Sequence, residues 1–274
     1  MSRGISIHIG LNMIDAPSEY YGESAPLTTC IQDSFDMRDI AISQGFEQNL
    51  LLLDDEATAD ALKNSIVSAS EELVDGDILF LSYSGHGASI EDENSDEDDS
   101  LDEAWCLYDR PFLDDELNLL WRLFEDGVRI FIISDSCHSG TMSKDIFNTT
   151  VVKSIVLSKE SQSIFRSKGF FQKLRELFSF EEDRELVATV KLLSGCSDEE
   201  ESLILGGAKN SLLTAEILNI WNNGNFMGTT NEFFEQVRVN VKREAKAVEC
   251  EQNPKFTTIG KDNSSFNSQK PFVI

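Results

Sequence analysis

The sequence predicts an α/β fold in which a mainly parallel sheet has helices on both faces. Short apolar runs alternate with amphipathic stretches of helical period through the first half of the chain. The runs are rich in Leu and β-branched residues and lack the polar alternation of half-exposed strands, which is typical of sheets buried on both faces. A repeated β-α-β order favours parallel strands joined by crossover helices. With 274 residues, 41% of them hydrophobic, the chain is long enough to bury such a core.

Strands and helices are expected in a regular order up to residue 140. The helix expected over Ala57–Leu73 has one apolar stripe, with Thr58 as its N-cap. The helix expected over Asp114–Asp126 has a second stripe and is followed by Gly127, a residue type favoured at helix C-termini. The apolar runs expected to form strands are Ile5–Leu11, Leu50–Leu53, Ile78–Tyr83 and Val128–Ile133.

The pattern lapses after residue 140 and resumes near residue 187. Residues 141–186 contain no clear strand and hold eight Lys and Arg residues in an otherwise acidic protein. Val187–Leu193 then reads as a strand, Ser211–Asn223 and Thr230–Lys246 read as helices, and the tail is polar until residues 271–274. We therefore expect one domain in three parts, namely a large portion over residues 1–140, a basic linker or insertion over 141–186 and a small portion over 187–274.

Charge and cysteine usage limit the expected partners. The formal net charge of −26 repels phosphate backbones, so nucleic acid is not an expected ligand, whereas cations and basic polypeptides are attracted. The five cysteines are widely spaced and include no C-x-x-C pair, which favours neither a disulfide framework nor a zinc site. No apolar run approaches the roughly 18 residues that a membrane span needs. A cytoplasmic, reducing location with no membrane partner is therefore expected.

Two residues with catalytic chemistry follow two of the expected strands. His86 and Cys137 both stand in short segments that contain glycine, after the strands that end near residues 83 and 133. Because the carboxyl ends of neighbouring parallel strands meet at one edge of a sheet, the imidazole and the thiol can come together there. A histidine is the usual means of generating a thiolate from cysteine. The backbone amides of Gly87 and Cys137 are then candidates for an oxyanion hole.

A lone histidine or cysteine at a strand end more often has a structural role than a catalytic one. Because His86 and Cys137 occur together in similar glycine-containing segments, a catalytic role is favoured for this pair. His8 lies inside an apolar strand and is interpreted as a core histidine. His138 adjoins Cys137 but points away from it if the local chain is extended, so no catalytic role is assigned to it.

These segments resemble the two catalytic motifs of the metacaspases, within the caspase-like clan of cysteine proteases. The motifs are Tyr83-Ser-Gly-His-Gly87 and Asp135-Ser-Cys-His-Ser-Gly140, and the histidine precedes the cysteine by 51 residues, similar to the interval of about 50 in caspases. The resemblance implies a caspase-like six-stranded, mostly parallel sheet between helices, and a cysteine endopeptidase that works through a thioester acyl-enzyme. It extends to Cys30–Asp33, Asp102–Glu103, Leu113–Leu117 and Leu193–Ser197.

The expected specificity is cleavage after Arg or Lys. Asp135 stands two residues before Cys137, so by the period of two it projects to the same side of the sheet. Asp33 begins the helical pattern that follows the first strand. The resemblance implies that both carboxylates line the primary specificity pocket, and Ser84 and Ser194 are assigned to substrate binding with them. Arg is expected to be preferred where two carboxylates match its fork, whereas a helix cap at Asp33 and a turn at Asp135 are the structural alternatives.

Calcium is the cofactor that the resemblance implies. The acidic stretch Glu91–Glu103 has oxygen ligands at EF-hand spacing, but Glu97 replaces the required glycine and a strand precedes it, so an EF-hand is rejected. Metacaspases often bind Ca²⁺ through dispersed aspartates, and an activating Ca²⁺ site is expected near the substrate cleft. For Asp114 and Asp115 the alternative role is to begin the helix expected there. By resemblance the ligands are Asp102, Asp114, Asp115 and Asp145.

The basic linker leaves two hypotheses open. A protease specific for Lys or Arg can cut its own chain between Lys144 and Arg184 and so separate the large and small portions. Alternatively, Ile164–Phe180 has apolar residues at helical spacing, so part of the linker packs as a helix or docks a regulatory partner. An activating protease is a further expected partner. The competing function is a catalytically inactive caspase-like scaffold that binds peptides or partners.

Overall fold

The centre of the molecule is a six-stranded, mostly parallel sheet, as the sequence predicts. A computed structural model describes residues 2–15, 20–21, 26–91, 101–137, 150–155, 157, 161, 163, 184–197 and 200–274. The strand order is β11-β9-β7-β3-β1-β2, and only the β11–β9 pair of this sheet is antiparallel. These strands are β1 (Gly4–Gly10), β2 (Gln48–Leu53), β3 (Ile78–Ser84), β7 (Arg129–Asp135), β9 (Thr189–Ser194) and β11 (Lys255–Gly260).

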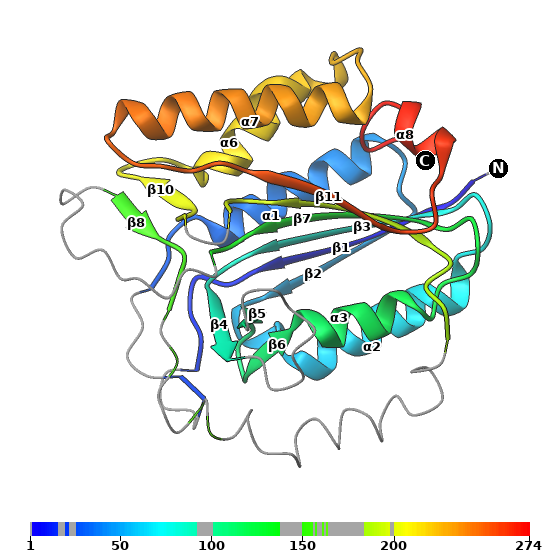
Figure 1. Ribbon diagram of the computed structural model, residues 1–274, viewed down its shortest axis with the longest axis horizontal. Coiled ribbons are helices and arrows are strands. Elements are labelled where there is room, and N and C mark those ends of the chain that lie inside the picture. Colours follow the sequence, from blue (N-terminus) through cyan, green and yellow to red (C-terminus); the bar gives the residue numbers. More distant parts are fainter. Residues whose placement is uncertain are drawn as a thin grey trace.

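Helices cover both faces of the sheet (Figure 1). On one face lie α2 (Ala59–Glu72) and α3 (Asp114–Trp121); on the other lie α1 (Cys30–Ser43), α6 (Leu212–Trp221), α7 (Thr230–Ala247) and the short α8 (Ser264–Ser268). Strand residues alternate between the two cores. Leu79 and Leu81 of β3 join the core under α2 and α3, whereas Ile78 and Phe80 join the core under the other helices. This alternation is the period of two along a strand that is buried on both sides.

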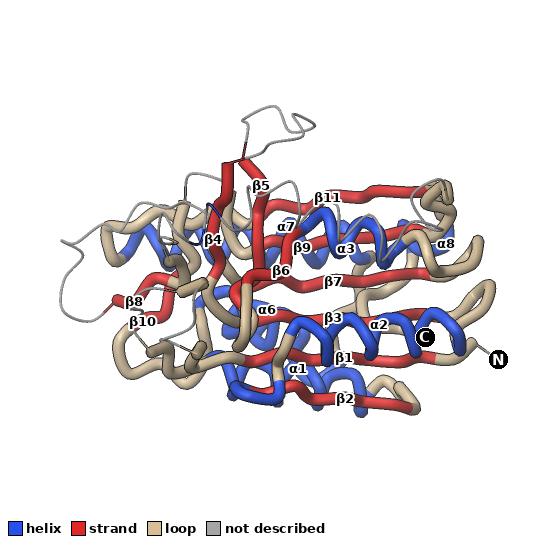
Figure 2. The backbone as a smooth tube through the Cα atoms, turned by 90° about the horizontal axis from the view of Figure 1, so that it is seen from below, coloured by secondary structure: helices blue, strands red, loops and turns tan. Residues whose placement is uncertain are grey.

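Two smaller sheets stand at the end of the central sheet where its parallel strands finish (Figure 2). One is antiparallel and contains β4 (Gly87–Glu91), β5 (Leu101–Cys106) and β6 (Pro111–Leu113). The other pairs β8 (Thr150–Val152) with β10 (Leu203–Leu205), also antiparallel. The expectation of no strand in residues 141–186 is wrong at β8, because three residues form a strand there only through pairing with a segment some fifty residues away.

Several boundaries differ from the expected ones. Helix α3 ends at Trp121, and the following turns lead to Gly127, whose φ of +85° suits a turn before β7 rather than a helix cap. The polar tail contributes β11, which the alternation of its residues does not reveal. The N-cap predicted at Thr58 is confirmed, because its side chain accepts from the backbone N–H three residues later, and Ser211 caps α6 in the same way.

The large and small portions share one sheet. Strands β9 and β11 follow residue 186, yet β9 pairs with β7 over the full length of that strand pair. Arg129 of β7 also donates hydrogen bonds to Gly76 O, Gln269 Oε1 and Val273 O, which ties the C-terminal tail to the large portion. Within the described ranges, no helix is both long and apolar enough to cross a membrane.

Candidate active site

Two neighbouring strands bring His86 and Cys137 to the same edge of the sheet. Strands β3 and β7 are parallel neighbours, and Ser84 is the register partner of Asp135. His86 and Cys137 each stand two residues beyond these partners, and both are buried. The sheet register therefore places the two predicted catalytic residues at matching positions, one strand apart.

The backbone around His86 is held by an aromatic pair. The Tyr83 hydroxyl donates to His86 O at 2.6 Å and to Cys106 O at 3.1 Å, and the Tyr83 ring stacks on Trp105 with centroids 4.6 Å apart. Gly85 lies so close to the Tyr83 hydroxyl that a Cβ there would stand 2.5 Å from it. The glycine before His86 is thus needed for the tyrosine to fix the loop.

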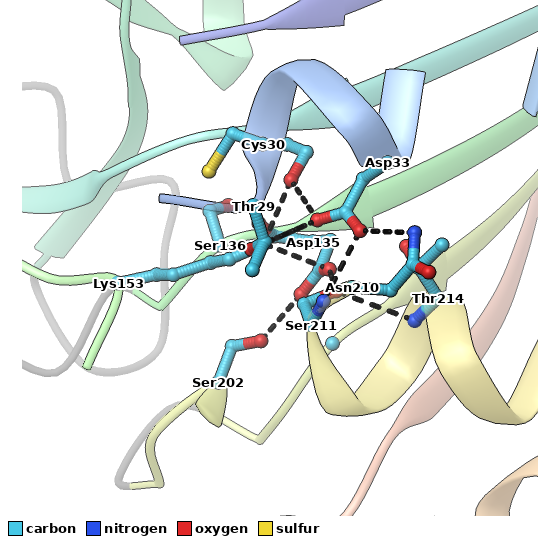
Figure 3. A network of polar contacts seen from close by, with 12 residues as sticks. Thr29, Cys30, Asp33, Asp135, Ser136, Lys153, Ser202, Asn210, Ser211 and Thr214 are labelled. Carbon is cyan, nitrogen blue, oxygen red and sulfur yellow. Dashed lines mark hydrogen bonds and ion pairs between the residues drawn. The ribbon is translucent and has the colours of Figure 1, made fainter. Parts of the chain in front are cut away.

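An ammonium group lies between the two predicted pocket carboxylates (Figure 3). Lys153 Nζ is 2.9 Å from Asp135 Oδ2 and 3.4 Å from Asp33 Oδ2, and it donates to Ser84 Oγ at 2.7 Å. The side chains of Lys153, Asp33 and Asp135 are essentially inaccessible to solvent. Asp33 stands in the first turn of α1, where the helix dipole favours a carboxylate.

The small portion completes the pocket around the carboxylates. Ser211 N and Asn210 Nδ2 donate to Asp33 Oδ1 at 3.1 and 3.0 Å. The hydroxyls of Ser202 and Ser211 donate to the two oxygens of Asp135 (Figure 3). Both carboxylates therefore have several donors besides the lysine, which is what buried charges require.

The charge state of this pocket follows from its burial and its pairing. Burial lowers the pKa of Lys153, but the charges of Asp135 and Asp33 outweigh it, so the net pKa of the lysine is raised above its ordinary value. Burial raises the pKa of Asp33, a shift that Lys153 opposes and the nearby Asp135 reinforces. A cationic side chain is the group that satisfies this site, because two adjacent carboxylates without a cation repel each other.

The backbone of Lys153 is bound as tightly as its side chain. Lys153 O accepts hydrogen bonds from the backbone N–H groups of Gly87 and Cys137, at 2.9 and 3.2 Å. Lys153 N donates to Ser202 O at 3.2 Å, continuing the ladder between β8 and β10. On the other side, Ile155 N donates to Gly87 O at 3.0 Å. Residues 150–155, here called the inserted segment, therefore lie extended across the site and are bound on both sides of Lys153.

The Cys137 sulfur has two close neighbours from the small portion. Ser202 N donates to Cys137 Sγ, and Cys196 Sγ lies 3.4 Å from it. Burial raises the pKa of the Cys137 thiol well above its ordinary value, and Cys196 adds to the rise. With the inserted segment in place, Cys137 is thus held as the thiol rather than the thiolate.

Other predicted site residues are placed less centrally. Ser194 ends β9 opposite Ser134, and the described groups of the small portion that contact the two pocket carboxylates are instead those of Ser202, Asn210 and Ser211. The predicted role of Ser194 in substrate binding stays a prediction.

The predicted calcium ligands are only partly described. Asp114 and Asp115 begin α3, directly after β6, and Asp102 stands in β5 two residues before Ala104, the register partner of Leu113. Asp102 thus stands in the small sheet, and Asp114 and Asp115 begin the helix that directly follows the last strand of that sheet. Asp145 lies outside the described residues, as do most of the acidic stretch and the predicted helix of the linker. Among the described side chains, no group of three metal ligands is assembled.

The sequence did not predict the residues of the small portion that surround the pocket carboxylates or support the loop that carries them. Ser202, Asn210 and Gln252 carry no motif, and Lys153 stood out only as one basic residue of the linker. The one usable signal was Asn-Ser before an apolar helical run, which predicts a helix N-terminus at residue 211. It does not show that this N-terminus meets Asp33.

Comparison with known proteins identifies the family. The model of the metacaspase peptidase C14 domain matches residues 7–145, about half of the chain, including the segments of His86 and Cys137. The chain belongs to the metacaspase family. Metacaspase-3 of Arabidopsis thaliana is 37% identical to this metacaspase over 137 residues, which are 45% of this chain and 38% of that protein. Metacaspase-1A of Neurospora crassa is 34% identical over 172 residues, which are 56% and 37% of the two chains.

A solved structure resembles this metacaspase over its whole length. The crystal structure of protein GSU0716 from Geobacter sulfurreducens matches 99% of both chains, with a TM-score of 0.79 and 32% identity. The matched parts of the curated metacaspases above are only about two fifths of those proteins. The predicted family and the caspase-like sheet are confirmed.

Proposed function

We propose that this metacaspase is a cysteine endopeptidase that cleaves polypeptides after Lys or Arg. The observation that carries the proposal is the way Lys153 is bound. Its ammonium group lies between Asp33 and Asp135, while its carbonyl accepts from two backbone amides, one of them that of Cys137. A substrate residue that precedes a cut bond needs both contacts, a pocket for its side chain and an oxyanion hole for its carbonyl. Arg fits the same charge and adds a planar fork.

The chemistry requires two steps at this carbonyl. The sulfur of Cys137 attacks the carbonyl carbon, and the negative charge that develops on oxygen is stabilised by the N–H groups of Gly87 and Cys137. His86, carrying the proton taken from the thiol, gives it to the leaving amine as the C–N bond breaks, which leaves a thioester. Water then attacks the thioester, His86 removes a proton from it, and the carboxylic acid leaves with the cysteine regenerated.

A peptide library tests this proposal. Purified protein is incubated with the library with and without Ca²⁺, and Cys137→Ala serves as the blank. The expected products end in Lys or Arg and are absent from the blank. Products that end in Asp or in apolar residues would contradict the specificity. No turnover, together with a thiol-reactive probe that labels Cys137 no differently from the other cysteines, would favour the inactive scaffold.

Self-processing is proposed at the bond between Lys153 and Ser154. Beyond Lys153, Gly87 forms a bridge with Ser154 and accepts from Ile155 N, so the bond after the lysine crosses the site in extended form. The intact segment therefore occupies the pocket that substrates need, and cutting it allows it to leave. Incubation with Ca²⁺ is expected to give a new N-terminus at Ser154, absent from Cys137→Ala and Lys153→Met but present in Lys209→Met, a change at an exposed lysine. Intact chain throughout would overturn this step.

Activation by Ca²⁺ is proposed for the aspartates near the start of α3. Hard oxygen ligands suit this cation, and Asp114 and Asp115 directly follow β6, the strand that pairs with the β5 strand of Asp102. Bound Ca²⁺ would supply positive charge that holds these acidic segments together, with Asp145 as the fourth ligand. Calorimetric titration with Ca²⁺ is expected to show binding that Asp114→Asn weakens. Equal heats for both proteins, or full activity after exhaustive chelation, would rule the site out.

A further inference from the structure

A second thiol lies against the candidate nucleophile. Cys196 Sγ is 3.4 Å from Cys137 Sγ and 3.5 Å from Ser136 O. The register of the sheet explains this position, because Ser134 of β7 pairs with Ser194 of β9 and Cys196 stands two residues beyond its strand, level with Ser136. Each of the two cysteines thus follows one of two adjacent parallel strands. They come from opposite sides of the basic linker and meet only in the folded chain.

The remaining cysteines are placed differently. Cys30 begins α1, Cys106 ends β5 and Cys250 follows α7, and no sulfur contact with another cysteine is recorded for them within the described structure. Burial raises the pKa of Cys30 to about 12 and also raises that of Cys106. All five cysteines are free thiols in this state. Cys137 and Cys196 are therefore the pair for which a disulfide needs the smallest movement.

We propose that Cys137 and Cys196 form a reversible disulfide when the protein meets a peroxide. The Cys137 thiolate attacks a peroxide oxygen, which gives a sulfenic acid at Cys137 and releases water or an alcohol from the peroxide. The Cys196 thiol then attacks that sulfur, the S–S bond forms, and the hydroxyl leaves as water. Two thiols are oxidised and one peroxide is reduced. A small-molecule thiol reverses the reaction by exchange.

Formation of the disulfide requires only a small movement of the two sulfur atoms, both of which lie on loops. A disulfide needs the sulfurs at about 2.05 Å, so they must close by roughly 1.4 Å. Both residues lie beyond the last hydrogen-bonded pair of their strands, where the backbone is not fixed by the sheet ladder. Gly195 precedes Cys196, and a Cβ added at this glycine would lie only 3.1 Å from Ser202 Oγ. The loop is therefore already closely packed against the pocket.

The inserted segment controls access to the pair. Both thiols are buried, and Cys137 N donates to Lys153 O, so the segment covers the nucleophile. Burial also keeps the Cys137 thiol protonated, and peroxides react with the thiolate. Oxidation is therefore expected to follow departure of the segment. The disulfide would stop turnover reversibly and protect Cys137 from sulfinic and sulfonic acids, which thiols do not reduce.

The alternative role of Cys196 is that of a small residue that fills space beside the nucleophile. In that case it would be replaceable by serine without any effect on the oxidation products of Cys137. The disulfide itself does not depend on the proposed function, whereas its effect on activity rests on that function. The test therefore detects the disulfide-linked peptide by mass spectrometry and measures peptidase activity in a separate assay.

The experiment compares wild type, Cys196→Ser and Cys250→Ser after hydrogen peroxide. Each protein is treated at a concentration that oxidises the exposed Met227, blocked with iodoacetamide and digested without reduction. Lys153→Ala is treated in parallel to loosen the inserted segment. Wild type and Cys250→Ser are expected to yield a peptide that links Cys137 to Cys196, sooner in the Lys153→Ala background, and dithiothreitol restores both thiols. Cys196→Ser is expected to yield sulfinic or sulfonic acid at Cys137, which dithiothreitol does not reverse.

Three results would overturn the proposal. The first is sulfinic or sulfonic acid at Cys137 of wild type without the peptide that links Cys137 to Cys196. The second is a disulfide between Cys137 and a different cysteine. The third is a Cys137 that stays reduced in both wild type and Lys153→Ala while Met227 is oxidised. A protein that forms the link but cuts no peptide contradicts the proposed function alone. A protein that cuts after Lys but forms no link contradicts the disulfide alone.

Discussion

Lys153 indicates which kind of chemical group the pocket formed by Asp33 and Asp135 accommodates. Burial of an ammonium group costs free energy unless carboxylates and hydroxyls replace its water, and here Asp135, Asp33 and Ser84 do so. Removing the lysine would leave two buried carboxylates close together, which is unfavourable. The pocket therefore holds a cation, which in this structure is the chain's own lysine.

The predicted catalytic pair, His86 and Cys137, gives the first prediction at the residue scale. Cys137→Ala and His86→Ala are each expected to lower kcat by at least about 10³-fold, because members of a catalytic unit do not substitute for one another. Cys250→Ala, at a cysteine beyond α7, is the matched control and is expected to keep its activity. Circular dichroism checks that the fold is retained. Turnover in either variant that remains close to wild type would refute the assignment.

His8 gives a prediction about stability rather than activity. Its ring is fully buried in β1, Nδ1 lies 2.8 Å from Ser82 Oγ, and burial lowers its pKa to about 3. Because the unfolded chain binds this proton near pH 6.5 and the folded chain does not, stability falls as the pH drops below 6.5. Between pH 7 and pH 5 this residue alone accounts for a loss of about 2 kcal/mol in the free energy of unfolding.

Urea unfolding at the two pH values measures this loss. His8→Asn keeps a hydrogen-bonding group in place of Nδ1 but does not titrate. The difference between pH 7 and pH 5 is expected to be smaller in the variant by about 2 kcal/mol. An equal difference in both proteins would show that His8 is protonated in the folded state.

The residues that the sequence could identify are those whose neighbours are fixed by strands. His86, Cys137 and Asp135 all stand at the ends of β3 and β7, so the order of parallel strands is enough to bring them together. Ser202, Asn210 and Gln252 are brought in by loops that fold over the strand ends. Their contacts depend on loop paths that no local pattern encodes.

At the scale of elements, the loop between β9 and β10 depends on one glutamine. Gln252 Oε1 accepts from Leu203 N, and Gln252 Nε2 donates to Gly195 O and Ser202 Oγ. This loop carries Ser202, whose carbonyl accepts from Lys153 N. The glutamine therefore positions the edge that binds the inserted segment, without touching that segment itself.

Gln252→Ala is expected to weaken that edge. It leaves buried backbone groups without partners and should cost about 1–3 kcal/mol of stability. Because the proposed substrates bind where the inserted segment lies, KM for a peptide is expected to rise more than kcat falls. Gln48→Ala, at an exposed glutamine of β2, is the control and should change neither. A fall in kcat with KM unchanged would show that Gln252 acts on the catalytic pair instead.

The sequence predicted the regular elements and missed the ones made by pairing. Strands β1, β2, β3, β7 and β9 and the helices α2, α6 and α7 were foreseen within a few residues, because their apolar runs and periods are strong, whereas β4, β5 and β6 were not foreseen. Strands β8 and β10 have three residues each and exist as a pair, so neither has a period of its own. Strand β11 has exposed and half-buried residues, as an edge strand does, and resembles a polar tail.

At the scale of the whole molecule, the cut chain is expected to stay together. A break after Lys153 separates β7 from β9, but these strands are parallel neighbours, and Ile133 and Leu193 share one core with helices α6 and α7. The self-cleaved protein should elute as one particle in size exclusion and keep its near-ultraviolet circular dichroism. Separate elution of residues 1–153 and 154–274 without denaturant would show that the linker holds the sheet together.

The charge of the whole protein agrees with the proposed substrates. A net charge of −26 attracts basic polypeptides and raises their local concentration, so their association should weaken as salt is added. The specific recognition remains with the pocket, because its two carboxylates are buried and screened less than the surface.

The central claim is that the acidic pocket selects the residue before the cut bond. The most direct test uses peptides that copy residues 150–157, Thr-Val-Val-Lys-Ser-Ile-Val-Leu, with Lys, Arg, Leu or Asp at the fourth position. The account predicts cleavage after Lys and Arg, with kcat/KM for the Leu and Asp peptides lower by at least about 10²-fold, since they leave the carboxylates without a cation. Values of kcat/KM for Leu or Asp within a few-fold of that for Lys would contradict it.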